Sequence, residues 1–218
     1  MSKAVVFDMD GVLFDTEKLC MDSWMEVARE RGIPDMEKVF PLCIGRNRTD
    51  TAQIVLDHYG KDFPYDQFRK ETSRWFHREI EENGMPMKPG VKELLRYLRE
   101  EGWPVGLASS TNRDSVIDQL QRADIRDFFS TVIGGDQILH SKPEPDIYLM
   151  ACEELRVDPK ETYAIEDSYN GIRSAYRAGM RPIMTPDLLP PTEEMGALCC
   201  VICKDLLQVR EYLRKNGQ

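Results

Sequence analysis

A short apolar run, Ala4-Val5-Val6-Phe7, is followed at once by two acids and a glycine in Asp8-Met9-Asp10-Gly11. A β-branched run of this length that stops at carboxylates is typical of a buried strand ending at the ligand-binding edge of an open parallel sheet. An acidic turn has the same composition, because Asp and Gly are ordinary turn residues. The residues that the rest of the chain places beside these acids decide between a turn and an active site.

The second half of the chain alternates helical patterns with short apolar strands. Strands are expected at 104–108, 131–133, 162–165 and 182–184, and helices at 91–100, 115–121, 145–155 and 170–178. Strands separated by helices of this length imply right-handed βαβ crossovers. The expected fold is therefore α/β, with a Rossmann-like, mostly parallel sheet flanked by helices.

Residues 15–85 have a different, purely helical pattern. Cys20, Trp24, Val27 and Ala28 form one apolar stripe before Gly32, and similar stripes occupy 52–59 and 65–76. A cluster of Gly, Pro and Asn at 83–90 ends this region. We therefore expect a Rossmann-like catalytic core formed by residues 1–14 and 86–218, and an inserted α-helical cap domain formed by residues 15–85.

Composition narrows the class of protein. The chain has 218 residues, of which 41% are hydrophobic and 31% charged, as in an ordinary globular protein. Its net charge of −9 argues against a nucleic-acid partner or an anionic membrane surface. No apolar stretch approaches membrane-spanning length, so we expect no membrane partner. We also expect a cytoplasmic location and a monomer.

Six cysteines lie without the spacing of a disulfide framework, which indicates reduced thiols. Cys200 and Cys203 form a CxxC around an apolar pair that is expected to be a buried strand. A structural role is favoured over metal binding or redox chemistry, because no second CxxC or nearby His completes a zinc site.

Three expected strands end in polar side chains: Asp8 and Asp10, then Ser109, then Glu166 and Asp167. Carboxyl ends of parallel strands share one edge of a sheet, so these distant residues can meet in one crevice. Clustered acids disfavour one another's ionised forms unless a cation compensates. Oxygen ligands of this kind suit Mg²⁺, which often joins carboxylates to a substrate phosphate.

A rigid loop supplies a candidate counter-charge. Lys142 is followed by Pro143 and Pro145, which stiffen the segment, although an isolated lysine is usually a solvated surface residue. With Lys142 and a metal neutralising charge, Asp8 could attack a phosphoryl group and form an aspartyl-phosphate. Asp10 could then move protons, and Ser109 could hold phosphoryl oxygens. Asp8 and Asp167 are the expected direct metal ligands.

Four segments, at 8–17, 107–110, 141–146 and 165–172, resemble the motifs of the haloacid dehalogenase superfamily in order and spacing. More narrowly, they resemble its β-phosphoglucomutase-like branch of phosphatases and mutases. The resemblance implies Asp8 as nucleophile and Asp10 as acid/base and as a carbonyl ligand of Mg²⁺. It also implies Ser109, Ser110 and Lys142 on the phosphoryl group, Asp167 as a metal ligand, and Glu166 as a direct or water-mediated neighbour of the metal.

The cap is expected to select the substrate in this branch, and Arg46 resembles the arginine of a substrate-contacting cap loop; a solvated surface arginine is the alternative. Mutases of this branch carry a His on the first cap helix where Cys20 stands here, and Cys20 is expected to be core.

The leading interpretation is therefore a Mg²⁺-dependent phosphatase of a small phosphorylated metabolite, with sugar phosphates first. A sugar-phosphate mutase, a phospho-accepting signalling protein and a non-catalytic phosphate-binding protein are the alternatives.

Overall fold

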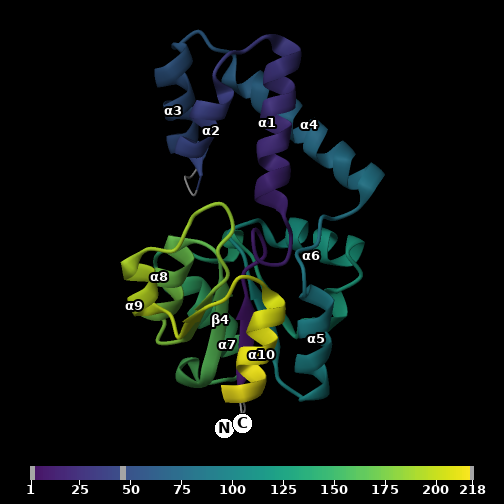
Figure 1. Cartoon of the computed structure of the whole chain (residues 1–218), viewed down its shortest axis with the longest axis vertical. Coiled ribbons are helices and arrows are strands. Elements are labelled where there is room, and N and C mark those ends of the chain that lie inside the picture. The colour runs from purple at the N-terminus through teal and green to yellow at the C-terminus, as the bar shows by residue number, and fades with distance from the viewer. Residues whose placement is uncertain (1–2, 45–47, 217–218) are drawn as a thin grey trace. The chain divides into compact units, whose positions relative to one another are not determined.

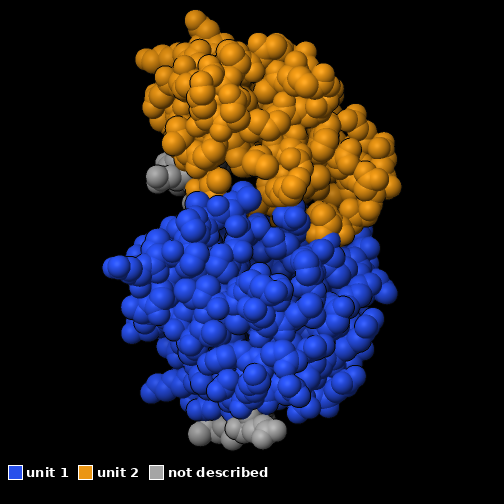
Figure 2. Space-filling view, viewed as in Figure 1, with its two compact units in different colours: residues 1–15, 87–218 blue, residues 16–86 orange. Residues whose placement is uncertain are grey.

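The structure is a computed structural model that describes residues 3–44 and 48–216. The chain divides into two compact units, which Figures 1 and 2 show. The core unit comprises Met1–Asp15 and Met87–Gln218, and the insert unit comprises Thr16–Pro86. Within the described residues, no helix is both long and apolar enough to span a bilayer.

The core unit is built on a six-stranded sheet in the order β3-β2-β1-β4-β5-β6. Every neighbouring pair is parallel, which confirms the Rossmann-like α/β fold. The expected strands agree with the observed ones to within one residue. The strands are β1 Ala4–Phe7, β2 Val105–Ala108, β3 Thr131–Ile133, β4 Thr162–Glu166, β5 Arg181–Met184 and β6 Val201–Ile202.

Helices connect the strands and cover the sheet. The expected helices of the core agree with α5 to α8 to within two residues, whereas α9 and α10 were not predicted. The helices of the core unit are α5 Val91–Glu100, α6 Arg113–Arg122, α7 Asp146–Leu155, α8 Tyr169–Arg177, α9 Glu193–Leu198 and α10 Leu206–Asn216. Short 3₁₀ turns lie at Arg126–Phe128, Gly135–Gln137 and Pro159–Glu161.

Successive side chains of a strand point to opposite faces of the sheet. Every residue of β1, β2 and β4 is buried, so both faces of these central strands are covered. Val6, Ala108 and Ala164 pack on one face in a cluster with side chains of α7 and α8. Tyr163 points to the other face, where its ring meets Tyr212 of α10 edge to face. The continuous apolar character of these strands therefore reflects two covered faces.

The C-terminal edge of the sheet differs from expectation. The pair between Cys200 and Cys203 forms β6, but Val201 is half-buried and Ile202 is 37% exposed, so this is an edge strand and not a buried one. Cys203 is buried and Cys200 is exposed. Among the described residues, neither belongs to a group that could hold a metal ion.

The insert unit consists of α1 Thr16–Arg31, α2 Met36–Cys43, α3 Arg48–Tyr59 and α4 Tyr65–Asn83. Sequence patterns indicated α1, α3 and α4 but not α2, which is short and contains Pro41. Trp24 of α1 is 6% exposed and packs edge to face against Phe40 and Phe68, at 5.3 Å between ring centroids in each case. Cys20 is only half-buried, so the expectation that it belongs to the core is wrong.

The aromatic cluster around Trp24 should dominate the stability of the insert unit. Replacing a buried Trp by Ala commonly costs about 3–5 kcal/mol, because apolar contacts are lost and a cavity remains. We therefore expect Trp24→Ala to lower the free energy of unfolding by about this amount in urea titrations followed by far-ultraviolet circular dichroism. Trp75→Ala is the matched control, because Trp75 lies on α4 and is only half-buried. Equal losses in the two variants would contradict this assignment of the core.

Candidate active site

The strand order places β1 between β2 and β4, at the point where the chain reverses its direction of travel across the sheet. Ligand sites of open α/β sheets lie outside the carboxyl ends of the strands at such a point. Asp8 follows β1 directly, Ser109 follows β2, and Glu166 ends β4 before Asp167. The sheet therefore brings together acids that lie more than 150 positions apart in the sequence.

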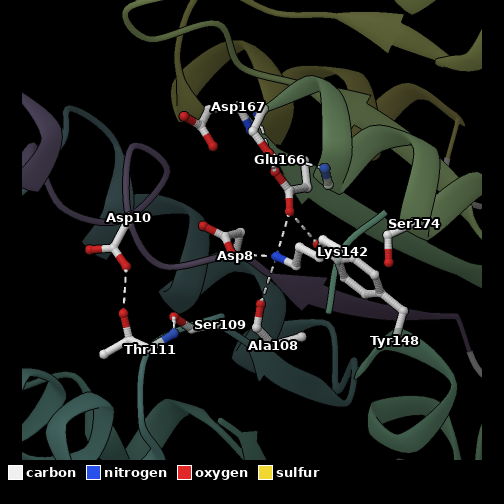
Figure 3. A network of polar contacts seen from close by, with 12 residues as sticks. Asp8, Asp10, Ala108, Ser109, Thr111, Lys142, Tyr148, Glu166, Asp167 and Ser174 are labelled. Carbon is white, nitrogen blue, oxygen red and sulfur yellow. Dashed lines mark hydrogen bonds and ion pairs between the residues drawn. The ribbon is translucent and has the colours of Figure 1, made fainter. Parts of the chain in front are cut away.

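Lys142 lies at the centre of this group, on the segment between β3 and α7. Its Nζ is 2.5 Å from Oδ1 of Asp8 and 2.6 Å from Oε1 of Glu166. It also donates to the carbonyl oxygen of Ala108 at 3.1 Å. Figure 3 shows the ammonium group between the two carboxylates, and only 7% of the lysine side chain is exposed. The interpretation of Lys142 as a solvated surface residue does not hold.

Glu166 is fully buried, and both of its carboxylate oxygens accept hydrogen bonds. Oε1 accepts from Lys142 and from the hydroxyl of Tyr148, the latter at 2.8 Å. Oε2 accepts from the backbone N–H groups of Asp167 and Ser168 and from the Ser168 hydroxyl. A buried carboxylate with this many donors is held in one orientation. Glu166 therefore orients the lysine that also contacts Asp8.

Burial and charge shift the pKa values of this group in opposite directions. Burial is the main cause that raises the pKa of Asp8 to about 8, while the charge of Lys142 acts against the rise. Burial alone would lower the pKa of Lys142, but the charges of Asp8 and Glu166 outweigh it and raise that pKa. The lysine is thus charged at neutral pH, and it is shared between two acids.

Asp10 is positioned from the neighbouring strand end. Thr111 donates its hydroxyl to Oδ2 of Asp10 at 3.1 Å, and the backbone N–H of Thr111 donates to Oγ of Ser109 at 3.1 Å. Ser109 is fully buried beside these groups, whereas Ser110 is exposed. The loop after β2 therefore holds the second acid next to the first (Figure 3).

Two glycines allow the acids to approach the backbone closely. Gly11 has a φ of +76°, and a Cβ built there would lie 2.3 Å from Oδ2 of Asp167. A Cβ on Gly171, in the first turn of α8, would lie 1.9 Å from the carboxyl group of Glu166. A larger residue at either position would displace a carboxylate, which explains why glycine follows each acidic motif.

The sequence-predicted residues Asp8, Asp10, Ser109, Lys142, Glu166 and Asp167 lie at this one edge of the core unit. Arg46 lies outside the described residues. Thr111 and Tyr148 were not predicted to take part. Thr111 directly follows the predicted Ser109-Ser110 pair, and Tyr148 stands on the buried face of α7, whose start Pro145 indicated.

Oxygen atoms of Asp8, Glu166 and Asp167 lie within 4.8 Å of one another, which is close enough for one cation to bind between them. Carboxylate oxygens are hard ligands and suit Mg²⁺. A cation here would also favour the ionised form of Asp8, which burial disfavours. The residues present therefore fit a divalent cation.

Comparison with known proteins gives consistent matches. Residues 5–185 match the family model of haloacid dehalogenase-like hydrolases. The chain is 33% identical over 185 residues to a phosphorylated carbohydrates phosphatase of Thermotoga maritima, covering 83% of each chain. It is 34% identical over 188 residues to hexitol phosphatase B of Escherichia coli, covering 84% of this chain and 83% of that one.

A solved structure extends the match to the whole fold. A provisionally named β-phosphoglucomutase of Thermotoga maritima superposes with a TM-score of 0.83 at 28% identity, covering 98% of this chain and 99% of that one. The region matched by the family model, residues 5–185, includes every polar strand end described above.

The raised pKa of Asp8 predicts a pH-dependent stability in the presence of a chelator. Between about pH 4 and about pH 8, Asp8 is protonated in the folded protein and ionised in the unfolded chain. The free energy of unfolding therefore falls as the pH rises through this range. Asp8→Asn removes the effect, and the variant should gain in melting temperature relative to the parent between pH 5 and pH 9. We expect a gain of at least about 3 °C, which for a chain of this size corresponds to about 1 kcal/mol in the free energy of unfolding.

Differential scanning fluorimetry across this pH range measures the gain. Asp118→Asn, at an exposed acid on α6, controls for the loss of one carboxylate. A constant difference between Asp8→Asn and the parent at all pH values would show that the pKa of Asp8 is not raised.

Proposed function

Because the chain belongs to the haloacid dehalogenase-like hydrolases, as its sequence motifs predicted, we propose that it is a Mg²⁺-dependent phosphatase of a small phosphorylated carbohydrate. One observation supports this most strongly: a buried lysine holds Asp8, at the end of the central strand, beside a second acid that the neighbouring strand orients. A nucleophile paired with a separate proton carrier can hydrolyse a phosphomonoester in two steps.

We assign the cation to Asp8 and Asp167, with the backbone carbonyl of Asp10 as a third ligand implied by the family resemblance. Glu166 belongs to the same cluster, but its oxygens already accept several hydrogen bonds, so we assign it to Lys142 and to the surroundings of the ion. When bound, Mg²⁺ supplies positive charge that offsets the charge of the phosphoryl oxygens.

The reaction then proceeds in two steps on the protein's own groups. A carboxylate oxygen of Asp8 attacks the phosphorus atom, the phosphorus–oxygen bond of the ester breaks, and the protonated Asp10 gives its proton to the leaving oxygen. The oxygen of a water molecule next attacks the phosphorus atom while Asp10 takes a proton from that water. The bond between phosphorus and the Asp8 oxygen then breaks, which releases inorganic phosphate and restores the Asp8 carboxylate. Lys142 and the buried hydroxyl of Ser109 stabilise the charge of the transferring group.

Thr111 has a positioning role in this scheme. Its hydroxyl fixes Oδ2 of Asp10, so the acid keeps one orientation while its proton leaves and returns. Ser110 is exposed and is assigned to the phosphoryl group only through the family resemblance.

The substrate class follows from the named relatives, one of which is a phosphatase of phosphorylated carbohydrates and another a hexitol phosphatase. We propose that the core unit is the catalytic domain and that the insert unit is the cap that selects the substrate, with Arg46 as a candidate contact. The absence of nucleic-acid and membrane partners, the monomeric state and the cytoplasmic location remain predictions from the sequence.

Removal of the nucleophile tests the proposal. We expect Asp8→Asn to lower Mg²⁺-dependent phosphate release from hexose and hexitol monophosphates by at least about 10³-fold, since the amide cannot form the covalent intermediate. A colorimetric phosphate assay with Mg²⁺ or with a chelator measures this. Asp118→Asn should retain the parental rate, because Asp118 is exposed on α6. Retained activity in Asp8→Asn would refute the assignment of the nucleophile.

The structural similarity to a provisionally named β-phosphoglucomutase makes a sugar-phosphate mutase the second candidate. A mutase primed with a sugar bisphosphate interconverts positional isomers and releases little inorganic phosphate, and ³¹P nuclear magnetic resonance distinguishes the two outcomes. We expect phosphate release to exceed isomerisation. A long-lived phosphoprotein without turnover would instead favour a signalling role.

A further inference from the structure

Asp187, on the loop after β5, carries a buried carboxylate oxygen that the scheme above does not use. Its side chain is 8% exposed, and its Oδ1 accepts from Nζ of Lys88 at 2.5 Å. Its Oδ2 is buried and has no hydrogen-bond partner among the described residues. Thr185, on the same loop, also has a buried hydroxyl oxygen without a partner there.

Asp187 lies close to Asp167, which belongs to the candidate cation site. A Cβ built on Gly11 would lie 2.3 Å from Oδ2 of Asp167 and 3.3 Å from Oδ2 of Asp187. Oxygens of Asp167 and Asp187 lie within 4.8 Å of each other. The carboxylates of Asp167 and Asp187 therefore lie close together, at the position that a side chain on residue 11 would occupy.

Two acceptors at this distance repel each other unless a donor or a cation lies between them. Lys88 is not that donor in this structure, because its ammonium group binds the other oxygen of Asp187 and Oδ2 has no partner among the described residues. The lysine holds Oδ1, so Oδ2 is the oxygen of Asp187 that is left for another donor. Buried polar atoms almost always find a partner, and water is a common one.

We propose that Asp187 is a positioning residue of the cation site, whose Oδ2 accepts a hydrogen bond from a water molecule that hydrates the ion held by Asp8 and Asp167. This inference rests on the proposed function, because it requires a divalent cation at those ligands. Mg²⁺ keeps several water molecules when it binds to proteins. Groups that hydrogen-bond the ligands of a metal orient them and contribute to its affinity.

The chain offers a matched control in Asp15. Lys88 also lies 3.6 Å from Oδ1 of Asp15, so Asp15 and Asp187 each place one negative charge beside the same ammonium group. The metal-site cluster with Asp167 includes Asp187 but not Asp15. Asp15→Asn and Asp187→Asn therefore remove equal charge, and only the second removes an acceptor that faces Asp167.

The test is Mg²⁺ binding measured by isothermal titration calorimetry on the full chain. In Asp187→Asn we expect the amide oxygen to accept the hydrogen bond from Lys88, because an ammonium group can only donate. The amide N–H group then replaces the acceptor near Asp167. We expect the dissociation constant for Mg²⁺ to rise about 10- to 100-fold, as for other groups that orient metal ligands. We expect Asp15→Asn to change it by less than about threefold, because the acceptor is retained.

Melting temperatures in a chelator separate this role from a structural one. Without metal, Asp187→Asn should melt no lower than Asp15→Asn, because each variant removes one negative charge beside Lys88 and only the amide at position 187 can donate to Asp167 and relieve the repulsion. A lower melting temperature with unchanged Mg²⁺ affinity would overturn the inference, and so would equal losses of affinity in Asp15→Asn and Asp187→Asn.

A further variant distinguishes failure of this inference from failure of the proposed function. If the parent chain binds no Mg²⁺, the proposed cation site is wrong, and the role of Asp187 is wrong with it. Suppose instead that the parent binds Mg²⁺ and that Asp167→Asn abolishes this binding. If Asp187→Asn then leaves the affinity unchanged, only the role of Asp187 is refuted.

Discussion

The buried ammonium group of Lys142 determines how the other charges of this protein can be arranged. It lies between Asp8 and Glu166, so one positive charge serves two carboxylates in a region without free access to water. Removing one partner of a buried ion pair is strongly destabilising, because the other charge is left unpaired. Glu166 is saturated by hydrogen bonds, and Asp8 is the acid that burial penalises. Asp8, the proposed nucleophile, is therefore the group that gains most from a bound cation.

The order of strands explains why such different segments meet. Asp8 is carried by the central strand, and its two neighbours in the sheet carry Ser109 and Glu166. The lysine arrives on the segment after β3, which places it beside all three strand ends. A chain that inserts a helical unit after β1 can change that unit without moving this edge of the sheet, because the register of β1 with β2 and β4 does not depend on it.

Much of the candidate site could be predicted from the sequence, because its acids and Ser109 come at the ends of apolar runs and Lys142 precedes two prolines. Thr111 and Tyr148 could not be predicted, since the direction of a side chain on a loop or a buried helix face depends on tertiary packing. The helix α2 was missed because it is short and contains Pro41. Asp187 follows a Thr-Pro pair and resembles an ordinary turn residue until the fold places it opposite Asp167.

We expect Asp8, which is paired with Lys142, to become covalently phosphorylated during turnover. Borohydride trapping tests it most directly, because the reagent reduces an acyl phosphate to an alcohol, and peptide mass spectrometry then locates the modified residue. We expect that quenching the enzyme with borohydride during turnover of a hexitol phosphate with Mg²⁺ converts Asp8 to homoserine, and that no conversion occurs without substrate. Turnover that proceeds with Asp8 unmodified, or modification at another acid, would contradict it.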